Sequence, residues 1–274
     1  MTVLLSVEGL TRRYAGLVAV DAVDMAVAAG TVHAVIGPNG AGKTTLFNLV
    51  SGITAPSAGR IVLGGHDITS LPADRRAALG LARTFQNIRI FGAMTVLENV
   101  LTGLHTTLRA GLVDVVLRLP RFRSDERAAV VQARAVLSMV GLAAAADQPA
   151  AALAYGDQRR LEIARALAAR PRLLLLDEPA AGLNPAETMA LAALIRTISA
   201  AGTTVLLVEH DMGFVMGISD AVTVLSFGRR IFQGDPASVR RSPVVIEAYL
   251  GAKVAARLQQ AAEAGTTLAG IRGA

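Results

Sequence analysis

Residues 37–44 read Gly-Pro-Asn-Gly-Ala-Gly-Lys-Thr, and this stretch is the strongest guide to the fold. It has the phosphate-loop pattern, in which a glycine and four further residues precede Gly-Lys-Thr. The apolar run 32–36 before it is typical of a buried strand, and residues 43–50 after it are typical of a helix. In that order, the backbone N–H groups of the turn and the N-terminus of the helix face a bound phosphate. The stretch therefore predicts an α/β fold with a phosphate-binding site.

The residue types in this turn have separate tasks. Glycines let the backbone approach phosphate, Lys43 supplies a compact charge, and the Thr44 hydroxyl suits Mg²⁺ as a ligand. Among 27 Lys and Arg residues, only Lys43 and Lys253 are lysines. Lysine at position 43 fits a point-charge phosphate site, for which a planar guanidinium is no substitute. The predicted phosphate contacts are Gly37, Pro38, Asn39, Gly40, Ala41, Gly42, Lys43, Thr44 and Thr45.

The rest of the chain alternates strand-like and helix-like segments. Apolar or alternating runs predict strands at 3–7, 18–27, 32–36, 61–63, 173–176 and 203–208, and a hairpin around Gly228. Helical patterns predict helices at 43–50, 72–79, 95–104, 125–140 with Ser124 as N-cap, 157–169 and 186–200. Residues 112–123 mix apolar and basic residues and receive no assignment, while the Ala- and Gly-rich residues 251–274 are typical of a frayed extension. This alternation favours a mostly parallel sheet with helices on both faces.

The composition excludes several classes of protein. A chain of 274 residues that is 53% hydrophobic has enough apolar volume for one large domain, or for one domain with a subdomain. It has no cysteine, which excludes disulfide frameworks, thiolate metal sites and cysteine nucleophiles. Glycines and a proline break the longest uncharged stretch, 25–42, so it cannot span a membrane, and the N-terminus lacks the order of a signal peptide. We expect a cytosolic chain.

The formal net charge of +6 raises the question of a nucleic-acid partner. The arginines form scattered doublets, such as Arg12-Arg13 and Arg159-Arg160, with no aromatic residues between them. Nucleic-acid modules usually combine basic residues with stacking aromatics or a recognisable motif. We therefore expect no nucleic-acid partner, and leave an acidic protein surface or anionic lipid headgroups as alternatives for the excess charge.

Residues 173–179, Leu-Leu-Leu-Leu-Asp-Glu-Pro, end an apolar strand in two carboxylates. Asp177 at the strand end is placed to hold magnesium, and Glu178 would lie near a terminal phosphate as the base for an attacking water. Paired acids after a strand also occur simply at helix N-termini. In a chain that carries a phosphate loop, the catalytic interpretation is favoured.

Residues 153–167 lie between these two motifs and read Leu-Ala-Tyr-Gly-Asp-Gln-Arg-Arg-Leu-Glu-Ile-Ala-Arg-Ala-Leu. With this segment, the chain resembles the ATP-binding-cassette (ABC) ATPases over about residues 3–250, because it matches their signature segment and helix. Further matches in the same order are Tyr14 as the aromatic that stacks on adenine, Gln86 as the glutamine-loop residue, residues 182–185 as the loop after the acids, and His210 as the switch histidine. Each is weak alone, but the ordered set is specific.

Two positions depart from the family's pattern. The usual Leu-Ser-Gly-Gly-Gln is here Leu-Ala-Tyr-Gly-Asp, so Ala154 lacks the hydroxyl that meets the γ-phosphate of the opposite protomer, and Asn184 replaces an aspartate. Nucleotide contact in this segment would rest on backbone N–H groups and a helix N-terminus, over Ala154, Tyr155, Gly156 and Asp157. The signature segment, with residues 210–212 and 248–251, is similar to the ATPases of branched-chain amino acid importers.

The resemblance implies an ATPase that uses ATP and Mg²⁺, built on a phosphate-loop NTPase core with a mostly parallel sheet, an antiparallel β subdomain and a helical subdomain. Its cassette domain would span 1–250, with the helical subdomain at about 87–165 and an extension at 251–274. The implied catalytic residues are Glu178, His210 and Gln86, and the implied metal ligands are Thr44, Gln86 and Asp177.

The resemblance also implies partners. Each ATP would lie between the phosphate loop of one chain and the signature helix of a second ATPase chain, so the active unit is a head-to-tail homo- or heterodimer. Transmembrane permease subunits would dock beside Gln86, at the cytoplasmic face of the inner membrane, with a solute-binding protein as an indirect partner. The expected function is to energise uptake of branched-chain or related hydrophobic amino acids.

Three alternatives compete with this interpretation. An ATPase of lipopolysaccharide export shares several features, but more often keeps Ser-Gly-Gly in the signature. Soluble cassettes that act on ribosomes or DNA usually carry two cassettes or a long insertion, for which 274 residues leave no room. The signature segment and His210 argue against a phosphate-loop kinase.

Overall fold

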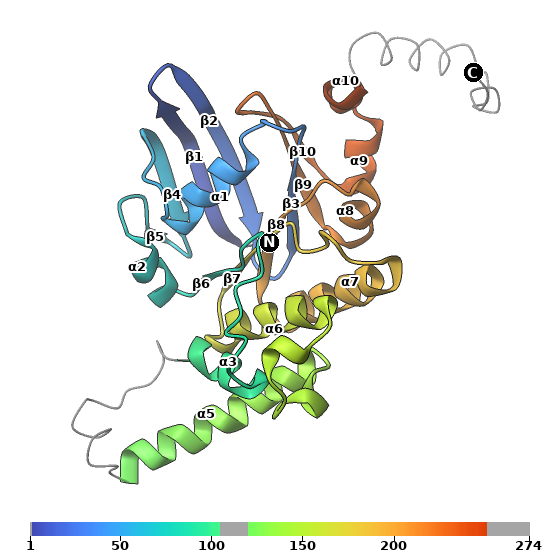
Figure 1. Ribbon diagram of the computed structural model, residues 1–274. Coiled ribbons are helices and arrows are strands. Elements are labelled where there is room, and N and C mark those ends of the chain that lie inside the picture. The colour runs from blue at the N-terminus through green and yellow to red at the C-terminus, as the bar shows by residue number, and fades with distance from the viewer. Residues whose placement is uncertain (1, 105–119, 251–274) are drawn as a thin grey trace, which may run out of the picture.

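The computed structural model of the protein describes residues 2–104 and 120–250 (Figure 1). The expected extension at 251–274 and residues 112–119 of the unassigned stretch lie outside the described residues. Two sheets and a group of helices make up the described part (Figure 1).

The larger sheet has six strands in the order β10-β9-β3-β8-β7-β6. Neighbouring strands from β9 to β6 are parallel, and β10 pairs with β9 in the antiparallel sense, as the hairpin around Gly228 predicts. Every residue of β3, β7 and β8 is buried, which is the pattern of strands covered on both faces. The bounds are β3 Val32–Ile36, β6 Leu81–Arg83, β7 Leu173–Asp177, β8 Thr204–Val208, β9 Ala221–Ser226 and β10 Arg229–Gly234. The prediction of a mostly parallel sheet is confirmed.

The smaller sheet is antiparallel, with the order β2-β1-β4-β5. Its strands are β1 Val3–Tyr14, β2 Leu17–Ala28, β4 Ala58–Leu63 and β5 His66–Asp67. The first strand continues well beyond the predicted residue 7, because irregularities in its register let it stay paired with β2 as far as Tyr14. Helix α1 (Lys43–Ser51) shares one apolar core with both sheets, through residues such as Leu46 and Phe47. The phosphate-loop helix is thereby fixed on two sides.

Helices cover the other face of the large sheet. The apolar side chains of α7 (Pro185–Ala200) and α8 (Met212–Ile218) pack with those of β3 and β7 in a second core. The short helices α9 (Pro236–Arg241) and α10 (Pro243–Leu250) lie on the same side as α8, whereas α2 (Ala73–Ala78) lies beside β5 and β6 (Figure 1). The sequence predicts α2, where Pro72 suits a first helical turn, and α7, but not α8, α9 or α10.

The remaining helices, α3 (Val96–Gly103), α5 (Pro120–Met139) and α6 (Tyr155–Ala168), gather at one end of the molecule (Figure 1). Two short 3₁₀ turns, Ala143–Ala145 and Ala150–Ala152, join α5 to α6. Helices α3 and α6 pack closely, since a Cβ at Gly103 would lie 2.1 Å from the carbonyl oxygen of Arg165. The prediction that Ser124 caps a helix is wrong, because α5 already begins at Pro120, a residue suited to a first helical turn. Across the described ranges, none of the helices has the length and apolar character needed to cross a membrane.

A buried histidine in the central strand makes the stability depend on pH. His33 of β3 is 1% exposed, and its Nε2 forms a 2.8 Å hydrogen bond with Thr223 Oγ1. Burial lowers the pKa of His33 from 6.5 to about 4. Between those values the unfolded chain binds a proton here that the folded chain does not, so the free energy of unfolding falls as the pH falls.

We expect His33→Asn to remove this contribution. Between about pH 7 and about pH 4.5, the unfolding free energy of the native chain should fall by about 2 kcal/mol more than that of the variant. Urea denaturation of both proteins at the two pH values measures the difference. Buried acids such as Glu209, whose pKa is raised by burial, are common to both proteins and cancel. An identical pH dependence in the two proteins would contradict the assignment to His33.

Candidate functional site

The phosphate loop connects β3 to α1 and is built from backbone. Gly42 stands at the N-cap of α1 in the left-handed conformation, with φ 97°. A Cβ at Gly42 would lie 2.4 Å from the carbonyl oxygen of Ala19, and one at Gly37 would lie 2.2 Å from that of Leu225. The glycines therefore permit both the turn of the loop and its close contact with the two sheets. The backbone N–H groups of the loop can then bind an anion.

Lys43 lies inside this loop. Its side chain is buried, and Nζ donates hydrogen bonds to the carbonyl oxygens of Gly37 at 2.7 Å and Pro38 at 3.0 Å. Burial lowers the pKa of Lys43, while the charge of Glu178 raises it. Thr44 is exposed and Thr45 is half-buried, on the first turn of α1. The loop thus holds an ammonium group beneath the predicted phosphate position.

The two predicted acids follow β7. Asp177 is 5% exposed, and its Oδ2 accepts a hydrogen bond from Arg83 Nη2 at 2.8 Å. Glu178 has φ 47°, in the left-handed region, and its N–H donates to the carbonyl oxygen of Val208 at 3.0 Å. Its Oε2 accepts a hydrogen bond from Gln86 Nε2 at 2.9 Å. The structure therefore brings together Gln86 and Glu178, which are far apart in the sequence.

His210 comes just after β8, the strand between β3 and β7 in the sheet. The carboxyl ends of three adjacent parallel strands thus place the phosphate loop, the acids and the histidine at one sheet edge, where α/β folds commonly bind ligands. The His210 side chain is 64% exposed, and its Nδ1 lies 3.7 Å from Oε2 of Glu209, which is 1% exposed. Glu209 Oε1 also accepts a hydrogen bond from the N–H of Ala180, at 2.7 Å.

Sequence reasoning missed Glu209 and Arg83. Arg83, at the end of β6, donates to Asp177 and also to Asn48 Oδ1 at 2.7 Å and Ser51 Oγ at 2.8 Å, both on α1. It thereby ties the phosphate-loop helix to the predicted metal carboxylate. The Glu-His order after a strand was the available signal for Glu209, whereas no sequence signal separates Arg83 from the other arginines.

The predicted signature residues open helix α6. Ala154 is the N-cap and makes no side-chain capping bond, while the Tyr155 hydroxyl donates to the carbonyl oxygen of Ala181 at 3.3 Å. A Cβ at Gly156 would lie 2.6 Å from Glu187 Oε1, so glycine at this position lets the Glu187 side chain pack against the start of α6. Asp157 forms an ion pair with Arg160. In the described part of the chain, no hydrogen bond or ion pair joins residues 154–157 to the phosphate loop of the same chain.

The two remaining predicted positions have local roles in the structure. Asn184 caps helix α7, with its Oδ1 accepting from the N–H of Glu187 at 3.0 Å, so this departure from the family pattern retains a capping side chain. Tyr14, the last residue of β1, is 42% exposed, and the Arg12 guanidinium lies 4.5 Å from the centre of its ring. One face of the tyrosine is thus already covered by a cation.

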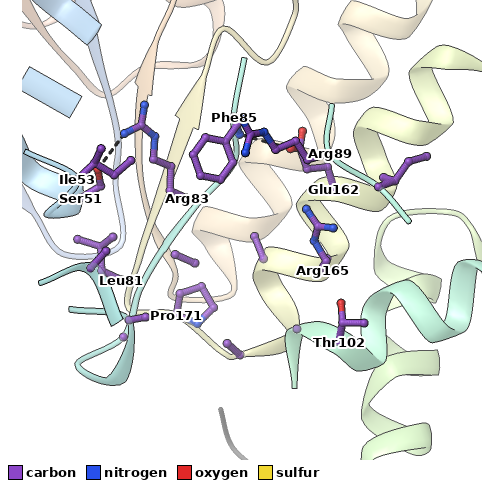
Figure 2. A pocket seen from close by; sticks show the side chains of 18 of the residues that line it. Ser51, Ile53, Leu81, Arg83, Phe85, Arg89, Thr102, Glu162, Arg165 and Pro171 are labelled. Carbon is purple, nitrogen blue, oxygen red and sulfur yellow. Dashed lines mark hydrogen bonds between the residues drawn. The ribbon is translucent and has the colours of Figure 1, made fainter. Parts of the chain in front are cut away.

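Beside Gln86, a groove of about 870 Å³ separates the sheets from the helices (Figure 2). Figure 2 shows Phe85 in its centre, Arg83 and Ser51 on the side of the sheet and α1, and Glu162 and Arg165 on α6. Phe91 also lines it and is 51% exposed. The groove combines aromatic and cationic side chains next to the predicted glutamine loop.

The profile of the family described as ABC transporter matches residues 20–181, and that of the family described as branched-chain amino acid ATP-binding cassette transporter matches residues 229–255. LivG of Escherichia coli strain K12, a high-affinity branched-chain amino acid transport ATP-binding protein, is 47% identical over 90% of this chain and 98% of its own length. BraF of Pseudomonas aeruginosa, with the same description, is 48% identical with the same coverage.

A lipopolysaccharide export system ATP-binding protein, LptB of Acidithiobacillus ferridurans, is 37% identical over 92% of this chain and 98% of its own length. Among solved structures, a nucleotide-free ATP-binding cassette from an ABC transporter has a TM-score of 0.79 and 30% identity, and covers 90% of this chain and 99% of that chain. The phosphate loop, the signature segment and the paired acids all lie within the span that the family profile matches. On these grounds, the chain belongs to the ABC transporter family, as one of its ATP-binding-cassette ATPases.

Proposed function

We propose that this chain is the ATP-hydrolysing subunit of an ABC importer that takes up branched-chain or related hydrophobic amino acids. The observation that carries the proposal is its near 50% identity to LivG and BraF along almost their whole length. The profile match at 229–255 adds a feature specific to branched-chain amino acid cassettes. The lipopolysaccharide-export alternative has less support, since LptB is 37% identical.

In this proposal, each predicted residue has a role at the nucleotide. Lys43 and the phosphate loop, residues 37–45, hold the phosphates, the loop through its backbone N–H groups, which every residue except Pro38 has. The exposed Tyr14 stacks on adenine. Water attacks the γ-phosphorus, and the bond to the oxygen that bridges the β- and γ-phosphates breaks, giving ADP and phosphate. Glu178 orients the water and takes its proton, and His210 stabilises the γ-phosphate in the transition state.

Magnesium fits the donor groups at this edge. The Thr44 hydroxyl, the Asp177 carboxylate and the Gln86 amide offer three oxygen ligands, which is the set that Mg²⁺ prefers. Asp177 is already paired with Arg83, and its second oxygen is the one that would bind the ion. When bound, the metal would neutralise charge on the phosphates. These three residues are the proposed ligands.

The signature residues support a split site. Residues 154–157 form the start of α6, and Tyr155 contacts Ala181 in the loop that follows Asp177 and Glu178. Within the described part of the chain, they make no hydrogen bond or ion pair with their own phosphate loop. The N–H groups of this helix start would therefore serve the nucleotide held by a second cassette, in a head-to-tail dimer. Sedimentation of the Glu178→Gln variant with ATP and Mg²⁺ tests this, because the dimer should form only with nucleotide.

We further place the cassette domain at 1–250, with its helical subdomain at about 87–165. Permease subunits would dock in the groove beside Gln86, which puts the chain on the cytoplasmic face of the inner membrane, with a solute-binding protein across the membrane as an indirect partner. The test is to reconstitute this chain with the permease subunits that co-purify with it. Leucine-loaded binding protein should raise ATP turnover of that complex, whereas stimulation by lipopolysaccharide alone would overturn the import proposal.

The groove also leads to a prediction about permease binding. Phe91→Ser removes an exposed aromatic side chain from the groove, and should reduce the amount of permease that co-purifies with this chain by about tenfold, because exposed aromatics often dominate such contacts. ATP binding by the isolated chain should not change. Val131→Ser is the matched control, since Val131 is an exposed apolar residue on α5 outside this groove. Equal recovery of permease with both variants would place the docking surface elsewhere.

A further inference from the structure

Just before Gln86, the hydrogen-bond partners of the backbone change from the sheet to helix α6. The N–H of Thr84 donates to the carbonyl oxygen of Leu175 at 3.0 Å and continues the pairing of β6 with β7. For the next two residues, Phe85 and Gln86, the backbone partners are side chains of α6. The glutamine loop is therefore anchored to the helix that the signature segment opens.

Two buried charged residues make this anchor, which we call the Arg159–Glu162 clasp. Arg159 Nη1 donates to the carbonyl oxygen of Phe85 and Nη2 to that of Gln86, both at 3.1 Å. Glu162 Oε1 accepts from the N–H of Phe85 at 3.4 Å. The two side chains pair with each other at 3.2 Å, and each is 1% exposed. One helical turn thus holds both sides of the Phe85 residue.

The clasp is linked to the predicted catalytic carboxylate of Glu178 through Gln86. Beyond the held backbone, Gln86 Nε2 donates to Glu178 Oε2 at 2.9 Å. Helix α6 itself is fixed to the other helices, through the close approach at Gly103 and a 2.7 Å hydrogen bond from Gln132 Nε2 to the carbonyl oxygen of Ala168. A displacement of these helices relative to the sheet must therefore displace Gln86 relative to Glu178.

A buried ion pair couples the loop to the position of α6 better than apolar packing alone would. Buried ion pairs add little to stability compared with apolar residues of the same size, but they fix geometry through directional bonds. Apolar side chains at 159 and 162 would fill the space, yet leave two carbonyl oxygens and an N–H outside the sheet without these partners. The clasp thus sets where the loop sits on α6.

We infer that Arg159 and Glu162 are positioning residues that make Gln86 follow the signature helix, so that the position of α6 decides how Gln86 meets Glu178. This inference rests on the proposed function, because it takes Glu178 and Gln86 as parts of a working ATPase. In the described part of the chain, neither clasp residue has a hydrogen bond or ion pair to the phosphate loop, so we expect their loss to change kcat much more than KM for ATP.

The experiment is a double-mutant cycle on the reconstituted transporter. Arg159→Met with Glu162→Met removes both charges together, and should lower kcat about tenfold while KM for ATP stays within about twofold. Gln86→Ala alone should also lower kcat. With all three changes, turnover should equal that of Gln86→Ala, because the clasp acts through Gln86. Should the double variant not fold, Arg159→Lys goes through the same measurements, because it keeps the charge but replaces the rigid fork of two nitrogens with a single nitrogen on a flexible stem.

Control variants separate the outcomes. Arg76→Met removes another buried arginine that donates only to backbone carbonyls, away from Gln86, and should lower the melting temperature without changing kcat more than about twofold. Losses that multiply when the clasp and Gln86 changes are combined, or an equal rise in KM, would overturn the inference. A failure of the proposed function would look different. In that case the native complex would not hydrolyse ATP, or Glu178→Gln would hydrolyse it at the native rate.

Discussion

Glu178→Gln should lower ATP turnover by about a hundredfold or more, which corresponds to about 3 kcal/mol or more in the activation barrier, while ATP binding is retained. The amide has the shape of the carboxylate but takes up no proton from water. The backbone bond to Val208 that holds residue 178 in its left-handed conformation does not involve the side chain, so the variant keeps its geometry. Release of phosphate and binding of a fluorescent ATP analogue measure the two effects separately.

Glu247→Gln is a suitable control, because it removes an exposed carboxylate on α10 that is not one of the predicted site residues. Its turnover should be that of the native chain. Near-normal hydrolysis by Glu178→Gln would refute the role of this residue as the base.

Lys43→Arg should weaken ATP binding by about tenfold to a hundredfold, or about 1.4 to 2.7 kcal/mol. The ammonium group fits between two carbonyl oxygens, of Gly37 and Pro38, at 2.7 and 3.0 Å. A guanidinium is larger and planar and would have to displace the loop to occupy the same buried space. Equilibrium binding of ATP with Mg²⁺ measures the loss directly.

The chain supplies its own control in Lys253→Arg, because Lys253 is the other lysine of the sequence. That variant should bind ATP normally. Unchanged affinity in Lys43→Arg would show that the rarity of lysine in this chain has no bearing on the phosphate site.

The large sheet could be predicted from sequence where its strands are buried on both faces. The apolar runs that became β3, β7 and β8 stand out from their surroundings, and the glycine turn fixes which strand leads into α1. Strand β6 escaped prediction, because only one of its three residues is fully buried and the strand ends in Arg83, so it forms no apolar run. Its place in the sheet comes from pairing with β7, which is information that no local pattern carries.

The candidate site likewise contains some residues that could be predicted from sequence and others that could not. Glu178, Gln86 and His210 could be picked from motifs, and the structure brings Gln86 to Glu178. The charged residues that support them could not be picked, since Arg83 and Arg159 look like the many exposed arginines of this chain. Burial, which gives such residues their importance, depends on elements distant in the sequence.

The ion pair of Arg83 with Asp177 has a consequence for the catalytic cycle. An enzyme that releases its product passes through a stage without nucleotide or metal, in which a buried carboxylate would lack a counter-ion. Here Arg83 already balances Asp177 in this conformation and also binds α1. The site therefore stays electrically neutral at that carboxylate between turnovers.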